Sequence, residues 1–119
     1  MNQTSLIRIA SLFAFFGVAL GAFGAHGLKA LLLEKGTLPT WETAVLYHLV
    51  HAVALLALSG LSSPPRAVVL CFSFGIFIFS GSLYVLSVTG IKILGAITPF
   101  GGVAFLVGWA WLAWGAKIR

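Results

Sequence analysis

The chain has 119 residues, of which 61% are hydrophobic and 8% are charged, and its formal net charge is +5. A soluble domain has roughly 45–50% apolar and about 25% charged residues, so this composition excludes a soluble globular fold. The seven basic residues are scattered singly at the ends of apolar runs. They form no basic stripe, which excludes a protein that binds nucleic acid.

Four long stretches carry no Asp, Glu, Lys or Arg. They contain 20 residues between Arg8 and Lys29, 23 between Glu42 and Arg66, 25 between Arg66 and Lys92, and 24 between Lys92 and Lys117. A helix needs about 20 apolar residues to cross the roughly 30 Å hydrocarbon core of a bilayer. The sequence therefore predicts an all-α membrane protein, a compact bundle of four transmembrane helices in one domain, with no room for a soluble catalytic domain.

The first predicted span covers about residues 5–26. Small residues recur along it at steps of three and four, so they share one face of the helix: Ala10, Ala14, Gly17, Gly21 and Gly24. Helices in lipid associate through close backbone approach over small residues. We expect this face to pack against the second or the fourth span, and a seam between copies of the chain is the alternative.

A short helix at the membrane interface is predicted over about residues 28–35, which are too few to span. Gly36 suits its C-terminal end. The second span covers about residues 41–61, with Thr40 as its predicted N-cap. Trp41 then lies at interfacial depth, where indole rings are favoured.

Two histidines of the second span, His48 and His51, are three residues apart, which predicts that they project from one face. His51 follows Trp41 by ten residues, so it lies about 15 Å deeper, near the bilayer midplane. His26 ends the first span on the same side of the membrane as Trp41. Ionisable residues at membrane depth are costly and usually face the bundle interior, so these histidines are the default candidates for a functional site.

The third span covers about residues 66–88. Its hydroxyl groups recur at steps of seven, four and three and share one side of the helix: Ser73, Ser80, Tyr84 and Ser87. They could line a hydrophilic path, or each serine could bond to a carbonyl one turn earlier. The candidate polar site comprises five residues: His26, His48, His51, Ser80 and Tyr84.

Three interpretations of this site remain open. The imidazoles could ligate a metal or haem, they could form a proton or solute relay with the hydroxyls, or they could be neutral and hydrogen-bonded within the bundle. Glu34 and Glu42 are both peripheral, so no carboxylate supports acid–base catalysis. Cys71 is the only cysteine, which excludes an internal disulfide. We predict no enzyme, no catalytic residue, no metal and no cofactor.

The fourth span covers about residues 92–116. Pro99 and the pair Gly101 and Gly102 lie near its middle, which predicts a kink close to the level of the histidines. An aromatic and cationic anchor is predicted at its end, formed by Trp109, Trp111, Trp114, Lys117 and Arg119.

Four spans place both termini on one side of the membrane. Basic residues on that side are Arg8, Arg66, Lys117 and Arg119, and those on the other side are Lys29, Lys35 and Lys92. Because cytoplasmic loops carry the excess of Lys and Arg, this margin of four to three predicts cytoplasmic termini.

Four sequence blocks, in this order, are similar to the YgdD-like family of small bacterial inner-membrane proteins. They read Leu-Gly-Ala-Phe-Gly-Ala-His-Gly at 20–27, Tyr-His-Leu-Val-His-Ala at 47–52, Phe-Ser-Gly-Ser-Leu-Tyr at 79–84 and Thr-Pro-Phe-Gly-Gly at 98–102. The resemblance covers essentially the whole chain. It implies four spans in a bacterial inner membrane and no agreed activity, substrate or cofactor.

The resemblance also singles out motif positions, which are His26, His51, Ser80, Ser82, Tyr84, Thr98, Pro99, Gly101 and Gly102. His48 departs from the family, in which glutamine is common there, and this departure weakens the metal hypothesis. We therefore expect a non-enzymatic accessory or structural membrane protein in contact with the lipid bilayer, as a homo-oligomer or part of a larger membrane complex. A small transporter or channel that uses His26, His51 and the polar face of the third span is the alternative, and a metal or haem binder is a weaker one.

Overall fold

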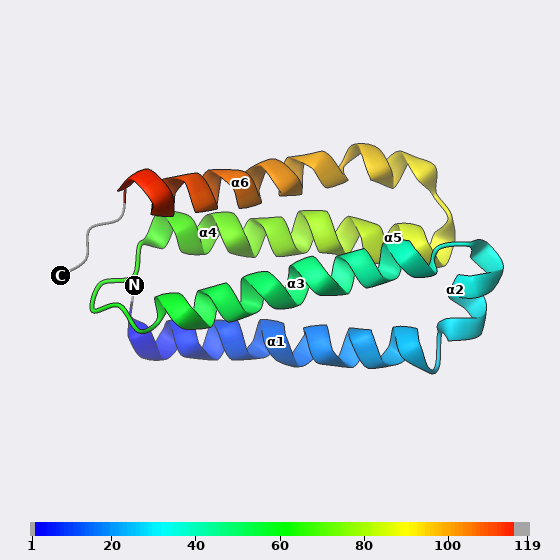
Figure 1. The fold of residues 1–119 in the computed structure, drawn as a ribbon, viewed down its shortest axis with the longest axis horizontal. Helices are drawn as coiled ribbons and strands as arrows, with labels where there is room; N and C mark the ends of the chain where they lie inside the picture. Colours follow the sequence, from blue (N-terminus) through cyan, green and yellow to red (C-terminus); the bar gives the residue numbers. More distant parts are fainter. Residues whose placement is uncertain (1, 116–119) are drawn as a thin grey trace.

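The computed structural model describes residues 2–115, and all regular secondary structure in that range is helical. Four antiparallel helical spans run along the molecule (Figure 1). They are α1 (Gln3–Ala25), α3 (Leu38–Leu58), a third span made of α4 (Arg66–Gly75), η1 (Ile76–Ser80) and α5 (Gly81–Thr89), and a fourth made of η2 (Lys92–Ala96) and α6 (Thr98–Gly115). Each is long and apolar enough to cross a membrane. The predicted all-α architecture with four spans is confirmed.

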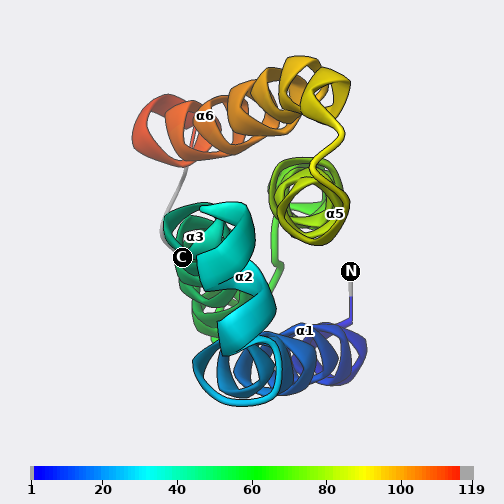
Figure 2. The ribbon, with the colours of Figure 1, turned by 90° about the vertical axis from the view of Figure 1, so that its right-hand side faces the viewer.

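The spans are arranged as a staggered layer. Seen end-on, α1 and α6 lie at opposite edges, and α3 and the third span lie between them (Figure 2). The molecule measures 51 × 26 × 17 Å. Helix α3 packs against α1 on one side and the third span on the other, while α6 packs against the third span. The two central spans therefore hold the bundle together.

The short helix α2 (Lys29–Lys35) crosses the ends of α1 and α3 (Figure 2). It ends at Gly36, whose φ of 70° is in the left-handed region that glycine adopts without strain. Helix α3 begins at Leu38, three residues earlier than predicted, and Thr37 takes the N-cap position that we assigned to Thr40. Pro39 is tolerated there because an N–H in the first turn has no intrahelical partner.

The third span is not a uniform α-helix. The five residues of η1 form a π-helical segment between α4 and α5. Such segments are uncommon and occur mostly as single wide turns within α-helices. Ser80, the last residue of η1, is completely buried. The wide turn therefore lies inside the bundle, where packing against neighbouring helices supports it.

The fourth span also changes its helical type. The 3₁₀ helix η2 precedes α6, and Pro99 is the second residue of α6. Pro99 therefore lies in the first turn of an α-helix and not in the middle of one. Proline is tolerated in the first turn because the N–H that it lacks would have no intrahelical partner there and its fixed φ is helical. Gly101 and Gly102 follow near the start of α6. The predicted anchor residues Lys117 and Arg119 lie outside the described residues, while Trp111 and Trp114 are exposed.

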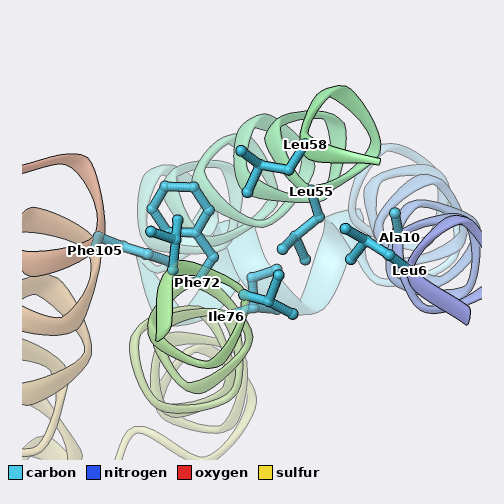
Figure 3. Packing of buried hydrophobic residues seen from close by; sticks show 9 residues of the cluster. Leu6, Ala10, Leu55, Leu58, Phe72, Ile76 and Phe105 are labelled. Carbon is cyan, nitrogen blue, oxygen red and sulfur yellow. The ribbon is translucent and has the colours of Figure 1, made fainter. Parts of the chain in front are cut away.

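An apolar core joins α1, α3, α4 and α6 at the end of the bundle opposite α2 (Figure 3). Phe72 of α4 and Leu55 of α3 are both fully buried there. The cluster consists of Leu6, Ala10, Leu55, Leu58, Val68, Val69, Phe72, Ile76 and Phe105. His51, a buried polar residue, borders this cluster through Phe72 and Phe105, while Ser80, Ser82 and Ser87 are buried nearer to α2.

Candidate functional site

The small-residue face of α1 packs against α3. A Cβ atom added at Gly17 would lie 2.6 Å from Leu49 Cδ2, and one added at Gly21 would lie 3.2 Å from Val45 Cγ1. Such distances are shorter than ordinary van der Waals contact. The predicted face is therefore occupied within one chain, and Ala14 lies half-buried on the same helix.

The Trp41 side chain packs in this seam, over Gly24. Its ring is 3% exposed, its Nε1–H donates to the Leu20 carbonyl at 2.9 Å, and its ring centroid lies 4.8 Å from that of Tyr84. A Cβ atom at Gly24 would approach Trp41 Nε1 to 2.3 Å. Trp41 is consequently a packing residue between helices, although its place near the start of α3 suggested an interfacial anchor.

His48 joins three helices. The ring is 4% exposed, with Nε2 2.8 Å from the Phe13 carbonyl oxygen of α1 and Nδ1 2.9 Å from the Tyr84 hydroxyl of α5. A carbonyl oxygen only accepts hydrogen bonds, so Nε2 carries the hydrogen of the neutral ring. The Tyr84 hydroxyl then donates to Nδ1.

His51 has the opposite tautomer. Its Nε2 accepts from Trp109 Nε1–H at 2.9 Å, because an indole nitrogen can only donate, and its Nδ1–H donates to the Tyr47 carbonyl at 2.7 Å. The ring is 3% exposed and stacks on Phe105 with a centroid distance of 3.6 Å. The Phe72 ring packs edge-on against the His51 ring, with a distance of 5.0 Å between the ring centroids. His51 is therefore enclosed by aromatic rings and has both nitrogens engaged.

Three serine hydroxyls of the third span, those of Ser80, Ser82 and Ser87, are also engaged. Ser80 is fully buried and donates to the Ala44 carbonyl of α3 at 2.8 Å. Ser82 donates to the Phe79 carbonyl at 3.0 Å and lies 2.6 Å from Thr98 Oγ1. Ser80 and Ser82 thus join Tyr84 in linking the third span to other spans through their side chains. The hydroxyl of Ser87 bonds within its own helix to the Leu83 carbonyl, at 2.7 Å.

The five candidate residues do not form one site. His48 and Tyr84 are in direct contact, and Ser80 bonds to α3 one turn away from His48. His51 faces α6, since residues three apart on a helix are offset by roughly 60° around its axis. His26 caps the C-terminus of α1 and is exposed. Among residues 2–115, no three His, Cys, Asp or Glu side chains are placed to hold a metal ion.

A second glycine seam, between the third span and α6, was not predicted. A Cβ atom at Gly75 would lie 2.3 Å from Phe105 Cδ1, and one at Gly108 would lie 2.5 Å from Phe72 Cε1. At Gly101 the atom would lie 2.3 Å from a backbone nitrogen of η1. The spacing of seven residues between Gly101 and Gly108 is the sequence signal that could have revealed this face.

An open apolar groove of about 460 Å³ lies between α1 and the third span. Its walls include Leu12, Phe16 and Phe77, and the rings of His48 and Tyr84 reach it from the interior. Because its lining is apolar, this groove offers no polar route for a solute, although it touches two of the candidate residues.

Comparison with known proteins supplies a family. Residues 20–102 match the family described as Protein of unknown function (DUF423). The chain is 53% identical over 110 residues to the UPF0382 membrane protein YwdK of Bacillus subtilis, covering 87% of this chain and 88% of the relative. A UPF0382 membrane protein of Haemophilus influenzae is 42% identical over 119 residues, covering 96% and 94%.

No solved structure matches the chain. The match to the family covers more than half of the sequence, and these relatives are matched over nearly their whole length. The chain therefore belongs to the DUF423, or UPF0382, family of membrane proteins of unknown function.

Proposed function

We propose that this DUF423 protein is a non-enzymatic accessory protein that acts by assembling with other proteins in the membrane, as a homo-oligomer or as part of a larger complex. Its polar interior serves to hold the four spans in register. We extend the proposal to a bacterial inner membrane, to cytoplasmic termini and to the YgdD-like group that the four motif blocks resemble.

One observation carries the proposal. Within residues 2–115, no buried side-chain nitrogen or oxygen lacks a hydrogen-bond partner. Residues that bind a substrate or a metal usually keep donors or acceptors free for it, whereas His48, His51 and Ser80 direct theirs to neighbouring helices. Interhelical hydrogen bonds of this kind contribute roughly 0.6 kcal/mol each in membrane proteins. They favour a structural role for the polar groups.

A transporter would need a hydrated passage beside these residues. His51 is enclosed by the rings of Phe72, Phe105 and Trp109. The groove beside Tyr84 is open and has an apolar lining. These features favour the accessory function over transport.

A native mass spectrum, recorded directly from membrane vesicles, tests the proposal. We expect an assembly of defined mass that contains more than one protein chain. The proposal would be contradicted by two results together. The protein would have the mass of a single chain, and it would carry a solute or proton flux in liposomes that Tyr84→Phe abolishes. Trp111→Phe is the control for the flux assay, because Trp111 is exposed and its indole has no hydrogen bond to the polar residues.

A further inference from the structure

A second groove, of about 500 Å³, follows the seam between α1 and α3 at the end that α2 crosses. Its two charged residues, Lys29 and Glu42, are both exposed. The remaining walls are apolar apart from the Trp41 indole, and they include the backbone of Gly21 and the side chains of Leu46 and Leu49. The groove therefore combines opposite charges at its mouth with an apolar furrow.

The length of the furrow matches one leaflet of a bilayer. Along α3 its walls extend from Leu38 to Leu49. Eleven residues at a rise of 1.5 Å correspond to about 16 Å, which is close to half of the roughly 30 Å hydrocarbon core. Lys29 begins α2 and Glu42 lies in the second turn of α3, so the charges are at the end of the spans. A ligand that fits is polar at one end and apolar over the depth of one leaflet.

We propose that this groove binds one phospholipid with a zwitterionic, primary-amine headgroup. The Lys29 ammonium pairs with the phosphate, the Glu42 carboxylate accepts from the lipid ammonium, and an acyl chain covers the α1–α3 seam. An anionic headgroup would be repelled by Glu42. A quaternary ammonium has no N–H to donate, so it forms no charge-assisted hydrogen bond with the carboxylate.

This inference goes beyond the accessory function and does not depend on it. Trp41 and Val45 pack over Gly24 and Gly21, and all four residues line the furrow. In a bilayer the apolar furrow must be filled by hydrocarbon or by protein. The opposite charges at its mouth favour the lipid over a second copy of the chain.

The test is native mass spectrometry of the full chain with equimolar phosphatidylethanolamine, phosphatidylglycerol and phosphatidylcholine that carry identical acyl chains. We expect one retained lipid per chain, with phosphatidylethanolamine preferred. Glu42→Gln should reduce its preference over phosphatidylglycerol roughly two- to fivefold, the range that corresponds to an exposed ion pair. Glu34→Gln is the matched control, since Glu34 is exposed on α2 and outside the groove.

Two further variants separate the headgroup from the furrow. Lys29→Met should weaken retention of all three lipids, whereas Lys35→Met should leave it unchanged. Leu46→Trp should fill the furrow and reduce retention without altering headgroup preference, and Leu56→Trp, at an exposed site on the same helix, is its control. Equal retention of the three lipids by the unaltered protein, equal effects of Glu42→Gln and Glu34→Gln, or a lipid-free dimer would each overturn the proposal.

Discussion

Replacing Gly101 with Ala should destabilise the protein strongly. A Cβ atom there would lie 2.3 Å from the backbone nitrogen of Phe79 and 2.8 Å from its Cα. Optimal carbon contacts are about 3.5–4.0 Å, so α6 and η1 would have to separate by about 1 Å. Because the opposing atoms belong to the backbone, no change of rotamer can relieve the overlap. We expect a loss of roughly 2–3 kcal/mol in the free energy of unfolding, toward the upper end of overpacking effects.

The adjacent glycine provides the control. A Cβ atom at Gly102 would lie 3.7 Å from Phe79 Cδ2, which is ordinary van der Waals contact. Alanine at this helical position removes backbone freedom from the unfolded chain, so Gly102→Ala should be neutral or stabilising by up to about 1 kcal/mol. The same substitution at neighbouring positions should therefore give opposite results.

Equilibrium unfolding in mixed micelles of dodecyl maltoside and dodecyl sulfate, followed by circular dichroism, measures both variants. If Gly101→Ala and Gly102→Ala had equal effects, the close approach of α6 to η1 would be refuted. Equal losses would instead fit the kink that the sequence predicted, in which both glycines serve flexibility.

Three further predictions follow from the same structure. His51→Phe and Trp109→Phe should show a coupling of about 0.5–1.5 kcal/mol in a double-mutant cycle of unfolding, and additive losses would exclude their hydrogen bond. Gly24→Ala should lower the free energy of unfolding by about 1–3 kcal/mol, since the pinned Trp41 ring cannot move, and a fluorescence-detected melt that is unchanged would contradict the packing. Ser80→Ala should cost roughly 0.5–1.5 kcal/mol by thermal unfolding in detergent, and no change would mean that its bond to α3 contributes nothing.

The four spans could be predicted because charges are excluded from the hydrocarbon core, so charge-free stretches mark them directly. The helical irregularities could not. The residue types of 76–80 and 92–96 do not distinguish a π or 3₁₀ segment from an α-helix. Pro99 marked a break, but only the structure shows that the break lies before an α-helix and not within it.

The sequence allowed us to predict which polar side chains of the candidate site are buried, but not which of them are hydrogen-bonded to each other. The positions of His48 and His51 in an apolar span indicated that they need partners. Apart from the Tyr47 carbonyl, their partners come from other spans, as far as 58 residues away for Trp109. Since α6 is apolar on all sides, nothing in its pattern indicates which of its three indoles faces a histidine.

The central position of α3 has a consequence for biogenesis. The side-chain hydrogen bonds of His48 to Tyr84 and of His51 to Trp109 both join α3 to spans that follow it in the chain. Before the third and fourth spans have been synthesised, His48 Nδ1 and His51 Nε2 lack these donors. These unpaired acceptors favour association with the remaining spans as soon as they are inserted. A chain truncated before Arg66 should therefore be less stable and be degraded by membrane proteases.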